Sequence, residues 1–517
     1  MKLSALMKSA EAFGDISKTD PDIGSIHYRA QEVIPGGLFV AVPGFSADGH
    51  DYIDEATKRG ASAIVAQKST VAQKRISIQG AVPLEVENSR KALARIAAAF
   101  YKNPSKKMTL TGITGTNGKT TTSFLVESIL SEAGFNVGVI GTINSRYKGR
   151  IFKSETTTPE SADLQRIMSD MLKEGATHVV MEVSSHAIDL DRILGSHFDV
   201  GVFTNLTRDH LDYHKSMENY WACKKKFFTD FIADGKNSAV VINRGDLNGR
   251  GLFDEFKATE KFKCGRVSVG FDGDNMIRPT EFTTDSFGVR GRVAALNSFF
   301  RLESKLIGRH NLENILCAVG AGVALNIPLD AIEKGVKKLE SAPGRLERIK
   351  NDRGLYIYID YAHTPDALEN VLRTLKALGN GAGGGRIVCV FGCGGDRDAQ
   401  KRPVMGNISG RLSDLSIITS DNPRTEDPGR IIEDIVKGIK KTCPNVYSPG
   451  DVKTGFRDKG YVVAPDRRQA VRLAIAASKP GDKILVAGKG HETGQLIRGK
   501  VIPFDDRRQI LNALRGA

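Results

Sequence analysis

The chain has 517 residues, 40% of them hydrophobic and 26% charged, so it can bury more than one core and is not a disordered or fibrous protein. Lysine and arginine exceed the acidic residues (74 − 60, net charge +14), but they are scattered and do not by themselves predict a nucleic-acid partner. The N-terminus lacks the apolar core of a signal peptide, and no run reaches the ~18 to 20 apolar residues of a membrane span. Composition therefore predicts a cytoplasmic protein of several domains, without membrane insertion.

The first segment, residues 1–107, alternates short apolar runs with a helical pattern. Residues 37–42 and 63–66 predict strands, and residues 52–59 predict a helix. These elements indicate a small N-terminal α/β domain. The polar, proline-containing stretch 101–107 predicts the linker that follows it.

The second segment, residues 108–342, opens with the most informative motif of the chain. Residues 111–122 read Thr-Gly-Ile-Thr-Gly-Thr-Asn-Gly-Lys-Thr-Thr-Thr, between a predicted strand (108–113) and a predicted helix (123–133). Such glycines allow backbone N–H groups to face an anion, Lys119 can reach the outer phosphates, and a threonine hydroxyl can bind Mg²⁺. Ile113 stands where the usual spacing has glycine, so a glycine-rich turn without a ligand remains an alternative at this point.

Further apolar, β-branched runs predict parallel sheets that are covered on both faces. In the second segment these runs are residues 137–140, 178–183, 200–204 and 238–242, and the different alternation at 282–306 predicts added antiparallel strands. The third segment, residues 343–517, has runs at 387–391, 415–419 and 483–487, each followed by a glycine-rich or acidic turn. The predicted fold class is α/β in three domains: a small N-terminal α/β domain, a central P-loop ATPase-like parallel sheet and a C-terminal Rossmann-like domain.

Eight further motifs follow the phosphate loop in chain order. They are Met-Glu-Val-Ser-Ser-His (181–186), Asn-Leu-Thr-Arg-Asp-His-Leu-Asp-Tyr-His (205–214), Gly-Arg-His-Asn-Leu-Glu-Asn (308–314), Pro-Gly-Arg-Leu-Glu (343–347), Asp-Tyr-Ala-His-Thr-Pro (360–365), Gly-Cys-Gly-Gly-Asp-Arg-Asp (392–398), Asp-Asn-Pro-Arg (421–424) and Gly-Lys-Gly-His-Glu (488–492). With Gly-Thr-Asn-Gly-Lys-Thr-Thr, they resemble the Mur ligases, relatives of the folylpolyglutamate synthases, over nearly the whole chain.

The resemblance implies a particular activity. It is the ATP- and Mg²⁺-dependent addition of meso-2,6-diaminopimelate to UDP-N-acetylmuramoyl-L-alanyl-D-glutamate, through an acyl phosphate, in peptidoglycan precursor synthesis. It also implies that residues 1–107 bind the UDP substrate, residues 108–342 bind ATP and residues 343–517 bind the amino acid. One alternative is a lysine-adding member of the same family. An alternative from another class is a basic, nucleotide-regulated nucleic-acid-binding protein.

The resemblance also implies roles on the nucleotide side. Arg345 contacts the terminal phosphate across the domain boundary, Asn314 lies on the adenine side, and Asp360 binds the ribose. Lys224 is carbamylated by CO₂, which turns a cation into an oxygen ligand for a second Mg²⁺. The implied catalytic residues are Lys119, Lys224, His210 and Arg345; the nucleotide-binding residues are Gly115, Thr116, Asn117, Gly118, Lys119, Thr120, Thr121, Asn314, Arg345 and Asp360; and the metal ligands are Thr120, Glu182, His210 and Lys224.

Four of these residues have a simpler structural alternative. Glu182 could cap the following helix, His210 could hydrogen-bond within its own loop, and Arg345 could form an interdomain salt bridge. Because three lysines are consecutive at 224–226, the register is open, and a solvated basic helix face is the default interpretation without the resemblance.

For the substrates, the resemblance implies two further groups. Arg424 can grip the distal carboxylate of diaminopimelate with its planar fork, and Glu492 suits the distal ammonium; the alternative for Arg424 is a turn residue after Pro423. The sequence departs from the family at His27-Tyr28-Arg29, where Asp-Ser-Arg is usual near the uridine, and at Leu190. The implied dipeptide-binding residues are Thr157, Thr158, Ser184 and Arg192, and the amino-acid-binding residues are Arg397, Asp421, Asn422, Pro423, Arg424, Gly488 and Glu492.

Overall fold

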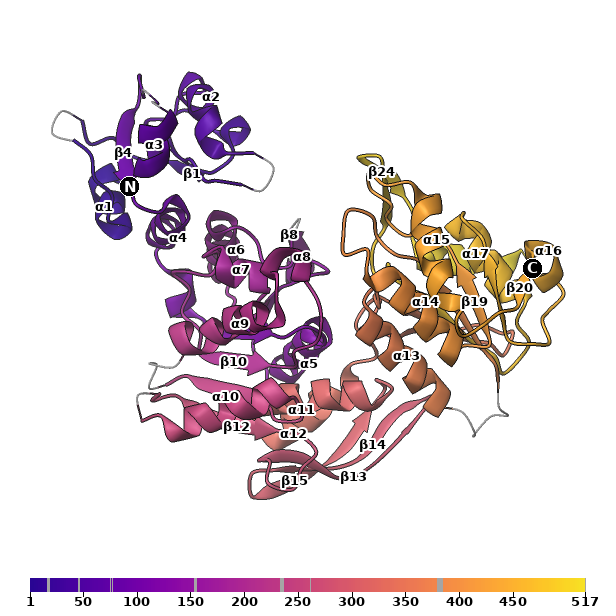
Figure 1. The fold of residues 1–517 in the computed structure, drawn as a ribbon. Helices are drawn as coiled ribbons and strands as arrows, with labels where there is room; N and C mark the ends of the chain where they lie inside the picture. The colour runs from indigo at the N-terminus through magenta and orange to yellow at the C-terminus, as the bar shows by residue number, and fades with distance from the viewer. Residues whose placement is uncertain are drawn as a thin grey trace.

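The computed structural model describes residues 1–517 except 16–18, 45–46, 75, 77, 153–155, 233–236, 261, 379–384 and 517. Three sheet-containing parts follow one another along the chain, coloured indigo, magenta and orange to yellow in Figure 1. The three-domain α/β architecture predicted from the sequence is therefore confirmed. No helix in the described ranges is both long and apolar enough to cross a membrane.

The N-terminal sheet is parallel, with the strand order β1-β2-β3-β4. Because side chains alternate along a strand, Leu38 and Val40 of β2 join the core that contains α1 and α4, while Phe39 joins the core that contains α2. The elements are β1 (Ser25–His27), β2 (Gly37–Val40), β3 (Ala63–Gln67), β4 (Val82–Val86), α1 (Leu3–Ala10), α2 (Ile53–Lys58), α3 (Lys68–Lys74) and α4 (Ser89–Phe100).

The central sheet has the order β15-β14-β13-β12-β11-β10-β5-β9-β6-β7-β8. Strands β12 to β6 of this order are parallel, and β13 to β15 form the predicted antiparallel extension. Helices α5 and α11 contribute to the core on one face, and α6 and α9 to the core on the other. The strands are β5 (Thr109–Thr114), β6 (Val137–Ile140), β7 (Ser145–Tyr147), β8 (Arg150–Phe152), β9 (His178–Glu182), β10 (Val200–Phe203), β11 (Ala239–Asn243), β12 (Gly265–Val269), β13 (Ile277–Asp285), β14 (Gly288–Ala295) and β15 (Ser298–Ser304). The helices are α5 (Lys119–Glu132), α6 (Ser161–Lys173), α7 (Ser185–Asp189), α8 (Leu211–His214), α9 (Met217–Phe231), α10 (Leu247–Ala258), α11 (Arg309–Ala324) and α12 (Leu329–Lys338).

The C-terminal sheet has the order β16-β17-β22-β18-β19-β21-β20 and is parallel except at β16. Helices α13, α14 and α15 cover one face, and α17 and α18 cover the other. The strands are β16 (Glu347–Ile349), β17 (Tyr356–Asp360), β18 (Ile387–Phe391), β19 (Leu415–Ile418), β20 (Val446–Tyr447), β21 (Gly460–Val463), β22 (Lys483–Ala487) and the hairpin strands β23 (Gly494–Ile497) and β24 (Lys500–Pro503). The helices are α13 (Pro365–Ala377), α14 (Lys401–Leu412), α15 (Pro428–Ile439), α16 (Pro449–Val452), α17 (Arg467–Ala476) and α18 (Asp506–Arg515).

The carboxyl ends of the two large parallel sheets face a shared cleft. Residues that follow β10 line one side of it, and residues that follow β17, β18, β19 and β22 line the other. This is the edge at which open α/β sheets bind ligands. The strand order therefore places segments more than 250 residues apart in the sequence around one site.

Candidate active site

The phosphate-type loop lies between the end of β5 and the start of α5, as the sequence predicted. Gly118 has φ +87°, and a Cβ there would lie 2.2 Å from Oδ1 of Asn314. Glycine is therefore required at this position for both its backbone conformation and its close contact. The same contact places the buried Asn314 of α11 directly against the loop.

Two lysine side chains converge on one carbonyl of this loop. Nζ of Lys119 and Nζ of Lys224 each donate to the carbonyl oxygen of Gly115 at 2.9 Å, and Lys119 also donates to that of Thr116 at 2.9 Å. Lys224 is only 1% exposed. Desolvation, and then the neighbouring Lys119 cation, lower the pKa of Lys224 well below its usual value. Its amine is therefore poised to lose its proton.

The three consecutive lysines of α9 have different surroundings. Lys224 is buried, Lys225 pairs with Glu255 at 2.6 Å, and Lys226 is exposed. Helical geometry turns neighbouring residues to different sides of α9, so only one member of the run can face the loop. Lys224 is that member.

Glu182 ends β9 beside the first turn of α5. Its Oε2 accepts hydrogen bonds from Oγ1 of Thr120 (2.9 Å) and of Thr142 (2.8 Å), and its Oε1 accepts one from the Thr142 N–H (3.0 Å). The N-cap of the following helix, α7, is Ser184, so Glu182 does not cap it. A hydroxyl and a carboxylate oxygen in contact are the hard donors that Mg²⁺ prefers, and the residues present fit that ion.

His210 is the N-cap residue of α8 and has the left-handed conformation, with φ +52°. Its Nε2 is 3.4 Å from Oδ2 of Asp209, and its ring packs edge-on to His186 with centroids 5.0 Å apart. Although the side chain is 44% exposed, desolvation by the surrounding protein lowers the pKa of the imidazole to about 4, against the opposing effect of Asp209. A neutral imidazole can offer a lone pair to a metal.

In the described part of the chain, no three His, Cys, Asp or Glu side chains gather into a metal site. A Mg²⁺ ion beside Glu182 could also take oxygen donors of other kinds. The Thr120 hydroxyl and the phosphates of a nucleotide are such donors. Lys224 would serve after conversion into an oxygen ligand, because Mg²⁺ prefers oxygen donors to an amine nitrogen.

Arg345 reaches this loop from the start of the C-terminal domain. Its guanidinium donates to Oγ1 of Thr120 at 3.2 Å and lies 4.6 Å from the ring centroid of Tyr361. Nε of Arg345 is buried and has no hydrogen-bond partner among the described residues. A buried N–H without an acceptor favours a phosphate oxygen at this position. No described acid forms a salt bridge with Arg345, in contrast to the simpler alternative.

Asp360 holds the turn that carries Arg345. Its two carboxylate oxygens accept backbone N–H bonds from Leu346 (2.6 Å) and Ala362 (2.7 Å). Burial raises the pKa of this carboxyl, against the opposing effect of Arg345. In this structure Asp360 thus positions Arg345, and ribose binding by Asp360 stays a prediction.

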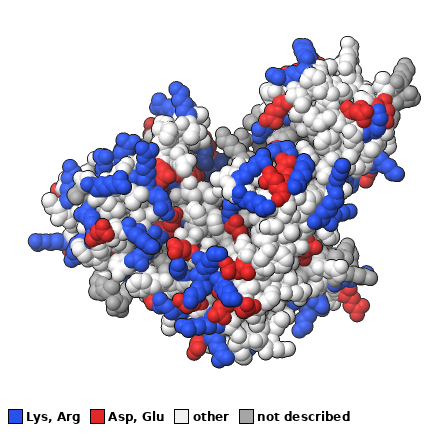
Figure 2. Space-filling model, turned by 180° about the vertical axis from the view of Figure 1, so that it is seen from behind, with Lys and Arg blue, Asp and Glu red and all other residues white. Residues whose placement is uncertain are grey.

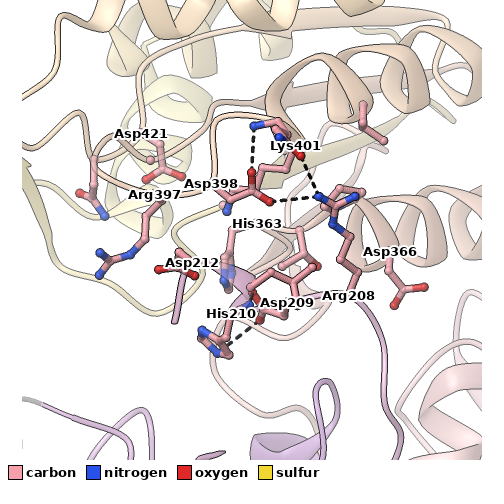
Figure 3. Close-up of a pocket in the computed structure, with 18 of the residues that line it drawn as sticks. Arg208, Asp209, His210, Asp212, His363, Asp366, Arg397, Asp398, Lys401 and Asp421 are labelled. Atoms are coloured by element: carbon pink, nitrogen blue, oxygen red, sulfur yellow. Dashed lines mark hydrogen bonds and ion pairs between the residues drawn. The ribbon is translucent and has the colours of Figure 1, made fainter. Parts of the chain in front are cut away.

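A cavity of about 370 Å³ lies between the central and C-terminal domains. Figure 3 shows Arg208, Asp209 and His210 on one wall, facing His363 and residues of the C-terminal domain. Asn117 of the phosphate-type loop reaches across to the C-terminal domain, where its Nδ2 donates to Oδ2 of Asp366 at 2.9 Å. The sequence-predicted residues that line the cavity are His210, Arg397, Asp421, Asn422, Arg424, Gly488 and Glu492.

Several lining residues were not assigned a role from the sequence. Asp209 lies next to His210 in its motif, and Asp366 directly follows the motif that ends at Pro365, so proximity to a motif was the signal available. Lys401 begins α14, in a basic pair with Arg402 just after the motif 392–398. The unassigned residues named here are Arg208, Asp209, Asp366 and Lys401.

The turn 421–424 presents Arg424 to the cavity. Arg424 has φ +53°, and its N–H donates to the carbonyl of Leu496 in β23 at 2.9 Å. One guanidinium nitrogen donates to the carbonyl of Gly395 at 2.7 Å. Arg424 is therefore a turn residue and a lining residue at the same time, while Pro423 is buried behind the turn.

The residues implied for the dipeptide form a cluster beneath Glu182. Oγ1 of Thr158 donates to the Glu182 carbonyl at 2.8 Å and accepts from the Ser184 N–H at 3.1 Å, and Arg192 donates to the Thr158 carbonyl at 3.2 Å. Oγ1 of Thr157 lies 3.2 Å from that of Thr142, itself bonded to Glu182. The cluster is thus continuous with the phosphate-type loop.

A second cavity, of about 960 Å³, opens from Arg192 towards the N-terminal domain. Residues 27–29, which include the departures His27 and Tyr28, line it together with residues of α6. The Tyr28 hydroxyl donates to Oδ2 of Asp163 at 2.7 Å, a contact that joins the two domains.

The fold and this site define a three-domain α/β protein whose phosphate-type loop faces a charged interdomain cleft. Three stretches match family profiles, described as "Mur ligase family, catalytic domain" (residues 22–101), "Mur ligase middle domain" (113–322) and "Mur ligase, glutamate ligase domain" (344–490). The chain belongs to the Mur ligase family.

Individual relatives match over nearly their full length. The UDP-N-acetylmuramoyl-L-alanyl-D-glutamate–2,6-diaminopimelate ligase of Geobacter metallireducens is 46% identical over 516 residues, 99% of this chain and 98% of that protein. Its namesake from Geobacter sulfurreducens is 44% identical over 98% of this chain and 96% of that protein. A solved structure of a ligase with the same name has a TM-score of 0.66 at 27% identity, covering 100% of this chain and 99% of that one.

Proposed function

We propose that this chain is an ATP-dependent ligase that joins meso-2,6-diaminopimelate to UDP-N-acetylmuramoyl-L-alanyl-D-glutamate in peptidoglycan precursor synthesis. The observation that carries the proposal is an interdomain cavity that joins His210 to Arg397, Arg424 and Glu492, with Asn117 of the phosphate-type loop hydrogen-bonded to its lining residue Asp366. Two relatives more than 40% identical bear the name of this activity.

Different residues of the chain would position the substrates and neutralise the charge of the phosphates. ATP, when bound with Mg²⁺, supplies the phosphoryl group that turns the acceptor carboxylate into an acyl phosphate. Lys119, Arg345 and the N-terminus of α5 place positive charge around the phosphates. Thr120 and Glu182 would hold Mg²⁺, and His210 and carbamylated Lys224 would complete the metal ligands. Arg397, Arg424 and Glu492 would orient the incoming amino acid.

We further propose that residues 1–107 bind the UDP moiety, residues 108–342 the nucleotide and residues 343–517 the amino acid, in the cytoplasm. The large cavity at residues 25–32 supports the first assignment. The nucleic-acid-binding alternative is less well supported, because on the face shown in Figure 2 basic side chains lie in separate groups, several with acidic side chains beside them.

Phosphate release tests the proposed reaction. The purified protein is given ATP, Mg²⁺ and the UDP-muramoyl dipeptide, with diaminopimelate, lysine or no amino acid. Release is expected with diaminopimelate and far less with lysine. Equal rates with both would refute the amino-acid assignment, and no release with either would refute the ligase assignment.

Replacing Arg424 by alanine is expected to lower kcat/KM for diaminopimelate by roughly ten- to a hundred-fold, and that for lysine much less. The reason is that a charge-assisted bidentate contact to the distal carboxylate is worth about 1.5 to 3 kcal/mol. Steady-state kinetics with each amino acid measure the effect. Arg472→Ala, at an exposed arginine of α17 that does not line the cavity, is the control. An equal loss for both amino acids would remove Arg424 as the selective group.

A further inference from the structure

A buried lysine lies beneath the amino-acid side of the cavity. Lys489 directly follows Gly488 at the end of β22, and its side chain is 0% exposed. Its Nζ donates to Oε2 of Glu492 at 2.8 Å and to Oδ1 of Asn422 at 3.0 Å, and lies 3.8 Å from Oδ1 of Asp421. This ammonium therefore joins the turn after β19 to the loop after β22.

Lys489 determines how the Asn422 amide is oriented. An ammonium only donates, so the amide must turn its oxygen towards Lys489. The same oxygen accepts the Leu496 N–H at 3.0 Å, and the amide nitrogen is left to donate to Oε2 of Glu492 at 2.8 Å. Reversing the amide would break three contacts at once. Lys489 thus fixes the faces that Asn422 and Glu492 present to a ligand.

Lys489 also changes the charge of the cavity floor. Among the charged residues that line the cavity, Asp421 and Glu492 lie against Lys489, and Arg397 and Arg424 are bases on the same amino-acid side. The buried ammonium behind the acids offsets part of their negative potential, in surroundings where water screens it little. A floor of lower negative charge accepts a carboxylate more readily and attracts a lone ammonium less.

We propose that Lys489 is a positioning residue that sets selectivity for the amino acid. Its ammonium holds Asn422 and Glu492 in place and favours an amino acid whose distal end carries a carboxylate beside its ammonium, over one with a distal ammonium alone. This inference rests on the proposed function, because it concerns the same amino-acid site. It assigns a role to a buried lysine that does not itself line the cavity.

The test compares Lys489→Gln with Lys489→Arg in the full-length protein. For Lys489→Gln, the ratio of kcat/KM for diaminopimelate to that for lysine is expected to fall about ten-fold or more, mainly through KM for diaminopimelate, while KM for ATP is unchanged. Lys489→Arg keeps the charge and is expected to keep most of the preference. If Lys489 had a purely structural role, its replacement would lower kcat/KM for both amino acids alike. That result would overturn the proposal.

A second variant covers the case in which Lys489→Gln does not fold. Asn422→Asp changes one atom and places a new carboxylate beside the Lys489 ammonium, so it should also move the preference towards lysine. An unchanged preference in Asn422→Asp would overturn the proposal. Wild-type protein that does not use diaminopimelate would instead refute the proposed function, so the two failures are distinguishable.

Discussion

Lys224→Ala is expected to lower ligase turnover by ~10²-fold or more while the protein stays folded. Lys224 is buried beside the loop, no acid among the described residues forms an ion pair with it, and burial favours its neutral amine. A neutral amine can attack CO₂, forming an N–C bond and releasing one proton, and the resulting carbamate offers two oxygens where the free lysine offered none. Alanine removes those oxygens.

Phosphate release with the dipeptide and diaminopimelate measures this loss, and short carboxylates such as acetate should restore part of the rate. Lys225→Ala is the matched control, since Lys225 pairs with Glu255 away from the loop. Mass spectrometry at elevated CO₂ should locate the mass added by one CO₂, about 44 Da, on Lys224. Modification confined to Lys225 or Lys226, or full activity of Lys224→Ala, would contradict the assignment.

Lys119→Ala is expected to abolish ligation, with a loss of ~10²-fold or more in kcat. Its ammonium donates hydrogen bonds to the carbonyls of Gly115 and Thr116, just before α5. From there it can move to the outer phosphates of a bound nucleotide and neutralise the charge that develops during phosphoryl transfer. Desolvation lowers the pKa of Lys119, and Glu182 and Asp209 oppose that shift.

Turnover at saturating ATP, together with the affinity for an ATP analogue, measures the effect. Lys107→Ala is a suitable control, because Lys107 is an exposed lysine that precedes β5 and lies outside the loop. Thermal unfolding of both variants verifies that they are folded. A folded Lys119→Ala protein with near wild-type turnover would overturn the role of this lysine.

The strands predicted from uninterrupted apolar runs are present in the structure, among them β9, β10, β11, β18 and β22. Such runs are specific because both faces of these strands are buried. Short strands such as β1 and β16 were not predicted, since three residues of mixed polarity carry no readable period. Their existence depends on pairing with β2 and β17.

The phosphate-type loop could be predicted from the sequence because it is local: one strand, one turn and one helix supply all of its backbone groups. The motifs also indicated the order of the domains, and most of the residues that line the cavity belong to them. These are properties of adjacent residues, and a single chain displays them directly.

Only the tertiary structure decided which charges meet. It selected Lys224 from three consecutive lysines, brought Arg345 to Thr120 across 225 positions, and placed Lys489 between Asn422 and Glu492. These contacts depend on strand order and on how two domains pack, which no local pattern encodes. The pKa of a group follows from those contacts and from its burial. The protonation chemistry of the site therefore also depends on the tertiary structure.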